Sequence, residues 1–381
     1  MPSTILLCAG GTGGHLFPAE AVASVLEDRG WRVELATDHR AKEYGRGFPA
    51  TEIHIVPSAT PSGRGVFGKA KATLQLAGGL VRALFMLRRV KPVAAAGFGG
   101  YPTAPPILAA RLLRVPTVIH EQNAVMGRAN KLLARFATRI ATSSPALKVQ
   151  GNWISKTVPT GNPVRPAVND VAGIPYKAPS PDGPIRLVVF GGSQGASYFS
   201  QVMPAALRRL RPDLVGRLRL VQQCRPEDLE EVSSLYRSLG IDAETAPFFA
   251  NLPSIIAKSH LVISRSGATT VSELAVIGRP AILVPLPGAI DQDQKINAEY
   301  LASVGGAWTY EEKSLGPRQL ADRMTELFDN TDKLVAAAGA AAGAGVSDGA
   351  LRLADLIELV ARKSETTPST SVEPNGKEAD A

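Results

Sequence analysis

Four glycine-rich turns each follow a short apolar run, and such turns allow backbone amides to approach a phosphate or a sugar closely. They lie at Gly10–His15 (GGTGGH), Gly97–Thr103 (GFGGYPT), Gly191–Ala196 (GGSQGA) and Arg265–Thr270 (RSGATT). One such turn is weak evidence, because tight turns need glycine for steric reasons alone. Two turns in each half of the chain, facing a common cleft, favour a bound diphosphate.

The turns do not match the signatures of two common nucleotide chemistries. A dinucleotide fingerprint needs a third glycine at position 16, where the chain has Leu16. A phosphate-binding loop of the Walker type needs a lysine, but GGSQGA continues with Ser197 and Tyr198. Hydride transfer and nucleotide hydrolysis are therefore disfavoured. The Cys and His residues show no metal-ligand spacing, so we expect no metal site and no cofactor.

The elements around these turns alternate between strand and helix. In the first half, the pattern predicts strands at Thr4–Ala9, Arg32–Ala36, Val93–Ala96 and Thr117–His120, and helices at Glu20–Arg29, Lys69–Arg89 and Ala129–Arg135. In the second half, it predicts strands at Ile185–Phe190, Leu218–Gln222, Leu261–Ser264 and Ala281–Pro285. Such alternation is typical of the α/β class, with parallel sheets covered by helices on both faces.

A proline-rich stretch gives the best domain boundary. Residues 161–184 contain six prolines and almost no periodicity. We therefore expect a first domain over residues 1–163 and a second over 164–345. A final helix over 351–363 is expected to pack back onto the first domain, and the polar residues 364–381 to form a disordered tail.

The net charge of +8 is unevenly distributed. Residues 1–165 hold 21 Lys and Arg against 8 Asp and Glu, whereas the remainder holds 21 against 26. A basic half suits nucleic acid, an anionic membrane or an anionic small substrate. The two cysteines suit a reducing compartment. We expect neither a signal peptide nor an apolar run long enough to span a membrane.

A longer set of ordered motifs carries a family resemblance. GGTGGHLFPA, GFGGYPT, HEQNAVMGRAN, GNPVR, GGSQGA, RSGATTVSE and DQDQKINA follow one another across residues 10–298. The chain resembles the MurG family, bacterial N-acetylglucosaminyltransferases of peptidoglycan synthesis. The resemblance implies the GT-B fold, with two Rossmann-like domains facing a cleft. It also implies inverting transfer from UDP-N-acetylglucosamine to undecaprenyl-pyrophosphoryl-N-acetylmuramoyl-pentapeptide, at the cytoplasmic face of the inner membrane.

Two residues are candidates for the base that such a transfer needs. His15 closes the first glycine turn, and an imidazole with an ordinary pKa of about 6.5 suits a base at neutral pH. The alternative is that His15 caps a helix or only hydrogen-bonds a substrate. Glu121, in HEQN, is the competing carboxylate and could instead orient its loop.

The resemblance also implies a set of binding residues. Thr12, Gly13 and Gly14 would lie against the donor or acceptor sugar, and Asn123 would contact the donor sugar. Arg165 would contact the diphosphate or sugar, although it could be a linker ion pair. Ser193 would help hold the diphosphate, and the backbone of Phe249 would read the uracil edge while Phe248 belongs to the core. The remaining members are Tyr101, Ala268, Thr269, Thr270, Val271, Ser272, Glu273 and Gln294.

Two of these assignments have specific alternatives. The family uses the position of Glu273 to bind both ribose hydroxyls, but Thr270-x-x-Glu273 is also a capping-box pattern. Gln294 would contact hydroxyls of the donor sugar. Relatives often have two adjacent glutamines here, whereas this chain has Asp293 before Gln294, and its loop over Pro287–Ile290 is about one residue longer.

The basic segment from Ser62 to Pro92 contains no acidic residue. Ala77, Leu80, Val81, Leu84 and Phe85 recur at helical spacing, and Arg82, Arg88, Arg89 and Lys91 flank them. This pattern indicates peripheral docking to an anionic inner membrane surface, or else a core-packed helix with a solvated basic face.

Nucleic acid is the weakest partner, because the basic residues have no interleaved aromatics. The rival functions are another GT-B enzyme, such as a UDP-N-acetylglucosamine epimerase or a glycolipid synthase, and a non-catalytic sugar-nucleotide-binding protein at the membrane.

Overall fold

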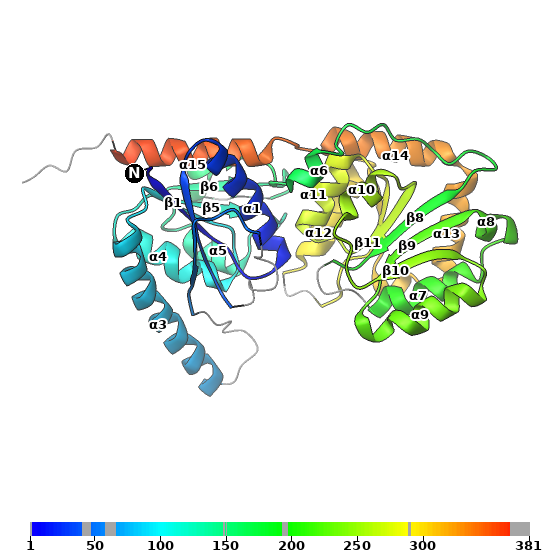
Figure 1. The fold of residues 1–381 in the computed structure, drawn as a ribbon, viewed down its shortest axis with the longest axis horizontal. Coiled ribbons are helices and arrows are strands. Elements are labelled where there is room, and N and C mark those ends of the chain that lie inside the picture. The colour runs from blue at the N-terminus through cyan, green and yellow to red at the C-terminus, as the bar shows by residue number, and fades with distance from the viewer. Residues whose placement is uncertain are drawn as a thin grey trace, which may run out of the picture.

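The protein consists of two α/β domains that lie side by side (Figure 1). The computed structural model describes residues 2–39, 47–57, 66–147, 149, 151–192, 197–288 and 291–365. This architecture confirms the predicted fold class.

The first domain is built on a seven-stranded parallel sheet in the order β3-β2-β1-β4-β5-β6-β7. Helices α1 and α15 pack on one face of the sheet, and α3, α4 and α5 pack on the other (Figure 1). The strands are β1 (Thr4–Cys8), β2 (Arg32–Thr37), β3 (Glu52–Ile55), β4 (Ala94–Gly97), β5 (Thr117–Glu121), β6 (Arg139–Thr142) and β7 (Thr157–Pro159). The helices are α1 (Gly13–Asp28), α3 (Val66–Val90), α4 (Ala104–Leu112), α5 (Arg128–Leu133) and α15 (Gly349–Glu365).

The second domain repeats this plan with six parallel strands in the order β10-β9-β8-β11-β12-β13. One hydrophobic cluster joins the sheet to α7, α8, α9 and α13, and another joins it to α6, α10, α11, α12 and α14. The strands are β8 (Ile185–Phe190), β9 (Leu218–Gln223), β10 (Asp242–Ala246), β11 (Leu261–Ser264), β12 (Ala281–Leu283) and β13 (Ala307–Thr309). The helices are α6 (Pro166–Asn169), α7 (Ser197–Leu207), α8 (Pro212–Arg217), α9 (Leu229–Ser238), α10 (Leu252–Ala257), α11 (Ala268–Ile277), α12 (Asp293–Ser303), α13 (Pro317–Asp329) and α14 (Thr331–Ala344).

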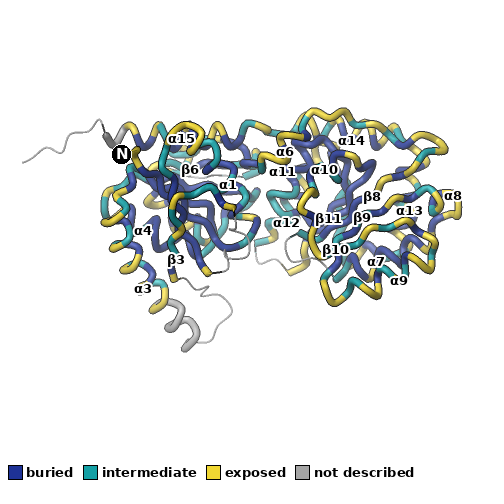
Figure 2. Tube along the Cα trace, viewed as in Figure 1, coloured by how far each residue is buried: buried dark blue, intermediate teal, exposed yellow. Residues whose placement is uncertain are grey.

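The central strands are the most buried part of each domain, as Figure 2 shows in dark blue. All five residues of β1 are buried, as expected for a strand of a parallel sheet covered on both faces. This is why largely apolar runs predicted β8 and β11 with their observed bounds. The prediction for α1 was wrong at its start, because the helix begins at Gly13 rather than Glu20. Glycine has a low helix propensity, so the first turn of this helix carries no helical pattern.

The last helix of the chain, α15, completes the core of the first domain. Its residues Leu353, Leu356, Ile357 and Val360 are buried in the same cluster as α1 and the sheet. Their positions, at i, i+3, i+4 and i+7, place them on one helix face. The helix continues to Glu365, so residues 364 and 365 are helical and not part of a disordered tail. Residues 366–381 lie outside the described structure.

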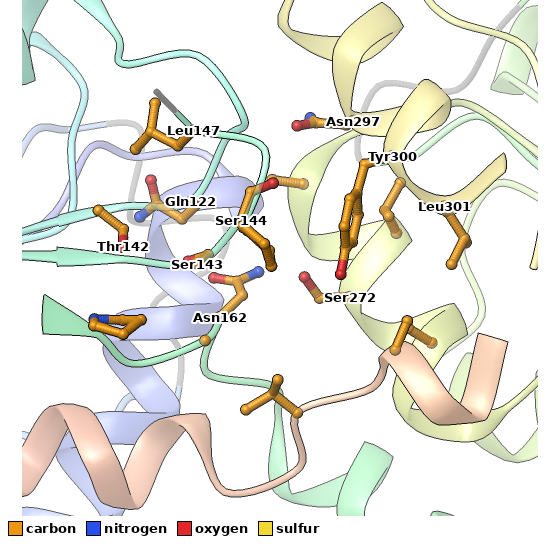
Figure 3. Close-up of a pocket in the computed structure, with 18 of the residues that line it drawn as sticks. Gln122, Thr142, Ser143, Ser144, Leu147, Asn162, Ser272, Asn297, Tyr300 and Leu301 are labelled. Carbon is orange, nitrogen blue, oxygen red and sulfur yellow. The ribbon is translucent and has the colours of Figure 1, made fainter. Parts of the chain in front are cut away.

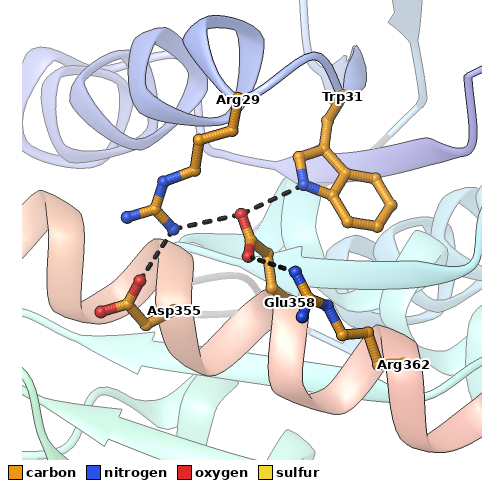
Figure 4. A network of polar contacts seen from close by, with 5 residues as sticks. All are labelled: Arg29, Trp31, Asp355, Glu358 and Arg362. Atoms are coloured by element: carbon orange, nitrogen blue, oxygen red, sulfur yellow. Dashed lines mark hydrogen bonds and ion pairs between the residues drawn. The ribbon is translucent and has the colours of Figure 1, made fainter.

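Polar contacts hold α15 against the end of α1 (Figure 4). Arg29 donates to Asp355 at 2.7 Å and to Glu358 at 3.1 Å. The indole N–H of Trp31 donates to the same carboxylate of Glu358 at 3.1 Å, and Arg362 also contacts it. Glu358 therefore attaches the polar face of α15 to the first domain through hydrogen bonds, while the apolar face of α15 is buried in the hydrophobic core.

The chain crosses between the domains twice, and the two crossings touch. Gly161 has a φ of +79°, and a Cβ built on it would lie 2.5 Å from a methyl carbon of Val346. A Cβ on Gly345 would lie 2.7 Å from the carbonyl oxygen of Ala275. Larger residues would force these backbones apart. The two connections therefore form one closely packed hinge region.

One stretch, Thr331–Arg362, reaches the length and hydropathy of a membrane span within the described residues. This differs from the sequence expectation. The stretch comprises α14 and α15, which are separate helices with a break after Ala344 and which pack on different domains. Its hydropathy reflects the many alanines of α14 and the core-facing side of α15.

Candidate active site

All four glycine-rich turns follow the central strands at which each sheet reverses its direction of growth. The first two follow β1 and β4, and the last two follow β8 and β11. In open parallel sheets, ligands bind beyond the carboxyl ends of the strands at this switch point. Helices α1 and α11, which begin at two of these turns, contact each other across the domains. Ser193, which was predicted to help hold the diphosphate, lies outside the described residues.

His15 lies in a slot that glycines form between the first two turns. A Cβ on Gly10 would lie 3.1 Å from the imidazole, and one on Gly99 or Gly100 would lie 3.2 to 3.3 Å from it. Gly99 and Gly100 also have φ values of +90° and +78°, which favour glycine. The neighbouring backbone therefore leaves room for the half-buried ring in the first turn of α1. Tyr101 begins the short 3-10 turn that follows these glycines.

Glu121 is buried at the end of β5, with 1% of its surface exposed. Its carboxylate accepts hydrogen bonds from the backbone N–H of Asn123 and of Gly127, and from the side-chain amides of Asn123 and Asn130, at 2.8 to 3.3 Å. Burial raises the pKa of this carboxyl, and the four donors oppose that shift. A carboxylate has about four lone-pair sites, so this one is saturated. The geometry favours loop orientation over proton abstraction as the role of Glu121.

Asn123 lies at the interface between the domains. Its Oδ1 accepts a hydrogen bond from Nδ2 of Asn297, on α12 of the second domain, at 3.1 Å. Oδ1 of Asn297 accepts from the backbone N–H of Ala124 at 2.9 Å. The loop that Glu121 shapes is therefore attached directly to the second domain. An ion pair between Arg128 and Asp291, at 3.6 Å, adds to the same contact.

Arg165 and Glu273 form a two-pronged ion pair. Nε of Arg165 lies 2.9 Å from Oε1 of Glu273, and NH2 lies 3.1 Å from Oε2. The guanidinium also lies 4.5 Å from the ring centroid of Phe17, on α1. Burial raises the pKa of the Glu273 carboxyl, and Arg165 opposes this shift. The pair thus joins the linker, α1 and α11, and each carboxylate oxygen retains a second lone pair for a ligand.

The start of α11 supplies a second polar surface. The helix begins at Ala268 with Gly267 as N-cap, so the capping-box alternative for Thr270 and Glu273 is wrong. That alternative placed the N-cap, and so the start of the helix, three residues too late. Among the described residues, the buried hydroxyl of Thr269 has no hydrogen-bond partner. The free N–H groups of the first helical turn and this hydroxyl suit an anionic ligand.

The remaining predicted residues lie in different surroundings. Phe249 is buried, whereas Phe248 is 66% exposed, so the expectation that Phe248 belongs to the core is wrong. Gln294 lies in the first turn of α12, and its Oε1 accepts from the backbone N–H of Leu286 at 3.0 Å. Thr12 is the extended N-cap of α1, and Gly14, in the first turn of that helix, is exposed, so that a Cβ built on it would meet no other atom within 4 Å.

A cavity of about 650 Å³ lies between the domains beside the hinge region (Figure 3). Ala268, Val271 and Ser272 line it from α11, whereas Arg165 and Glu273 are not among its lining residues. Both amide atoms of Asn162 are buried and have no partner among the described residues. Other lining residues are Gln122, Thr142, Ser143, Ser144, Leu147, Asn297, Tyr300 and Leu301.

One group in the described residues has the spacing of a metal site, and it lies away from the cleft. Glu34, Glu52 and His54 gather on the edge strand β3 and its neighbour β2. His54 already lies 2.7 Å from the carboxylate of Glu34, and Arg32 lies 2.9 Å from its other oxygen. These contacts account for the charge of Glu34 without an ion.

Sequence reasoning missed Asn297 and Arg265. Arg265 is 7% exposed and donates to the carbonyls of Val284 and Pro285. These bonds tie the turn before α11 to the segment that follows β12. Asn297 follows Gln294 by three residues in DQDQKINA, and this spacing puts both on one side of a helix. That spacing was the available signal, but only the structure shows what Asn297 reaches.

Comparison with known proteins adds the family. Residues 5–142 match the glycosyltransferase family 28 N-terminal domain, and residues 186–353 match the C-terminal domain of the same family. A protein of Methylorubrum extorquens is 54% identical over 355 residues, which cover 93% of this chain and 96% of that protein. It is named UDP-N-acetylglucosamine--N-acetylmuramyl-(pentapeptide) pyrophosphoryl-undecaprenol N-acetylglucosamine transferase.

Two solved structures place the fold. Acinetobacter baumannii MurG has a TM-score of 0.75 at 28% identity, covering 94% of this chain and all of that one. A UDP-N-acetylglucosamine 2-epimerase has a TM-score of 0.64 at 14% identity, covering 97% and 98% of the two chains. At 14% identity, the similarity to the epimerase indicates a shared fold and gives no information about function.

Proposed function

Because the chain belongs to glycosyltransferase family 28 and, within it, to the MurG family, it is an N-acetylglucosaminyltransferase, and we propose roles for its residues on that premise. It moves N-acetylglucosamine from UDP-N-acetylglucosamine to the lipid-linked N-acetylmuramoyl-pentapeptide, with inversion, in peptidoglycan synthesis. Lipid I thereby becomes lipid II. One observation supports this assignment of the site: α1 and α11 contact each other, and each begins at the switch point of a parallel sheet.

Inverting transfer is a single displacement, which needs a base and stabilisation of the departing diphosphate. We assign the base to His15, since the glycine slot holds it at the carboxyl end of β1 while the lone pairs of Glu121 are already used. The acceptor hydroxyl loses its proton to the imidazole as its oxygen attacks the anomeric carbon, and the bond to UDP breaks. The first turn of α11 and Arg165 would stabilise the charge that develops on the diphosphate.

Glu273 is proposed to accept the two ribose hydroxyls. Arg165 occupies one lone pair on each carboxylate oxygen, and the second lone pair on each remains available. The vicinal hydroxyls of a ribose offer two donors with a matching separation. The ion pair is then compatible with donor binding, because Arg165 orients the Glu273 carboxylate that accepts hydrogen bonds from the ribose.

The decisive experiment is a transfer assay with purified protein, labelled UDP-N-acetylglucosamine and a short-chain lipid acceptor. We expect a labelled disaccharide lipid. A UDP-sugar isomer would indicate an epimerase, and binding without a product would indicate a non-catalytic protein. The expectation that no metal cofactor is needed remains a prediction, and equal rates with and without EDTA would support it.

We also propose that the first domain docks on the anionic inner membrane surface, at its cytoplasmic side, through α3. Leu74, Val81 and Phe85 are 76%, 53% and 69% exposed. Their spacing of seven and four residues places them on one face of the helix. Leu80 and Leu84 instead pack against the core of the first domain. The predicted apolar stripe therefore splits into a core-facing row and a solvent-facing row.

The exposed row lies beside Arg82, Arg88 and Arg89, which are all exposed. Reversing these three charges to Glu should weaken binding to vesicles that contain anionic lipid by at least about tenfold, since each basic residue near such a surface contributes about 1 kcal/mol. Vesicle co-sedimentation measures this. The matched control reverses three exposed basic residues of the second domain, Arg208, Arg209 and Lys258, and should bind normally. Undiminished binding of the α3 variant would remove the proposal.

A further inference from the structure

Asn297 occupies an unusual place for a polar side chain. It lies in the second turn of α12, is only 4% exposed, and faces the loop of the other domain across the interface (Figure 3). Burying a primary amide costs free energy unless its donors and its acceptor find partners. The identity of those partners therefore indicates why the residue is present.

The amide of Asn297 makes three hydrogen bonds to two domains. Oδ1 accepts from the backbone N–H of Ala124 at 2.9 Å. Nδ2 donates to Oδ1 of Asn123 at 3.1 Å and to the carbonyl oxygen of Ser266 at 3.3 Å. One N–H of Asn297 therefore bonds to each domain, and its oxygen bonds to the first domain. A carboxylate of the same shape would keep only the bond to Ala124, because it has no hydrogen to donate.

These bonds fix the orientation of the Asn123 amide. Its Oδ1 is held by Asn297, and its Nδ2 donates to Oε1 of Glu121 at 3.3 Å. A flipped amide would place oxygen against the Glu121 carboxylate and N–H against N–H. The chain of contacts from Glu121 through Asn123 to Asn297 therefore presents one remaining N–H of Asn123 in a set direction.

The second hydrogen bond donated by Nδ2 of Asn297 leads to Gln294, the other residue proposed to contact the donor sugar. Ser266, whose carbonyl accepts from Asn297, donates its own hydroxyl to the backbone carbonyl of Gln294 at 2.8 Å. Gln294 lies one helical turn before Asn297 on α12. Asn123 from one domain is thus connected to the backbone of Gln294 from the other through Asn297 and Ser266.

We propose that Asn297 is a positioning residue for the donor sugar, which couples the approach of the two domains to the orientation of Asn123. The proposal rests on the donor site given above. Asn297 acts through Asn123, whereas recognition of the nucleotide is assigned in this proposal to Glu273 and the first turn of α11. The two halves of the donor should therefore respond differently when Asn297 is replaced.

The test compares the affinities of UDP-N-acetylglucosamine and of UDP, measured by calorimetry on the full chain. Asn297→Ala and Asn297→Asp should each weaken binding of the sugar nucleotide about tenfold, which equals about 1.4 kcal/mol and matches the loss of one or two hydrogen bonds. Binding of UDP should change less than about twofold. Glu299→Gln, an exposed change on the same helix, is the matched control and should leave both affinities unaltered.

A double-mutant cycle with Asn123→Ala separates positioning from general structural damage. If Asn297 acts through Asn123, its replacement should have little further effect on sugar-nucleotide affinity once Asn123 is alanine. Additive effects, or equal losses for UDP and UDP-N-acetylglucosamine, would overturn the proposal. The wild-type transfer assay stands apart from these outcomes: wild-type protein that makes no disaccharide lipid would instead refute the proposed function.

Discussion

Replacing His15 with alanine should lower the turnover number by about 100- to 10,000-fold, the range that a positioned base contributes. The Michaelis constant for UDP-N-acetylglucosamine should change little, because the base acts on the acceptor hydroxyl in the transition state. The fold should survive, since the ring lies against glycine backbone and not within the hydrophobic core. Steady-state kinetics with a short-chain acceptor, together with a thermal melt, measures both expectations.

His15→Gln is the informative companion variant. Glutamine keeps hydrogen-bonding capacity but cannot accept a proton near neutral pH. If His15 is the base, the glutamine variant should be as slow as the alanine variant, and the acid limb of the wild-type pH–rate profile should disappear. Unchanged turnover would remove the assignment. A raised Michaelis constant with normal turnover would reduce His15 to a substrate contact.

Replacing Glu273 with alanine should weaken binding of both UDP and the sugar nucleotide by at least about 100-fold. The variant loses the acceptor of the ribose hydroxyls and also leaves the guanidinium of Arg165 without its partner. Removing one member of a buried pair typically costs about 3–5 kcal/mol. Calorimetric titration with UDP measures the loss of affinity, and a denaturant melt shows how much of the effect is on the fold.

A second variant separates these two effects. Replacing the pair together, as Arg165→Met with Glu273→Leu, removes both charges and leaves no unpaired group, so stability should be close to that of the wild type. UDP binding should still be lost, because leucine accepts no hydrogen bond. Normal UDP affinity in this double variant would assign the pair a purely structural role at the linker.

Several features could be predicted from the sequence because their causes are local. A strand buried on both faces needs a continuous apolar run, and a strand-to-helix turn at a ligand site needs glycine. These two rules were enough to find β8, β11 and the four turns. The order of strands then follows from the repetition of one known plan in each half.

Other features depend on where side chains meet, which a sequence pattern does not encode. The spacing of Leu353, Ile357 and Val360 predicts an apolar helix face, but it does not identify α1 as the surface that this face covers. Phe248 and Phe249 are adjacent and chemically identical, so only the path of the backbone decides which one is buried. The pairing of Arg165 with Glu273 likewise joins residues that are 108 positions apart.

The docking of α15 onto α1 has a consequence for the order in which the protein is made. The first domain needs α15, which follows α1 by more than 300 residues, so the part of α1 that packs against α15 is uncovered when α1 leaves the ribosome. At about 5–20 residues per second, its partner follows only after roughly 15–70 seconds. The second domain, which α14 closes, can assemble first. The newly made first domain must therefore wait with an open hydrophobic face until α15 has been made.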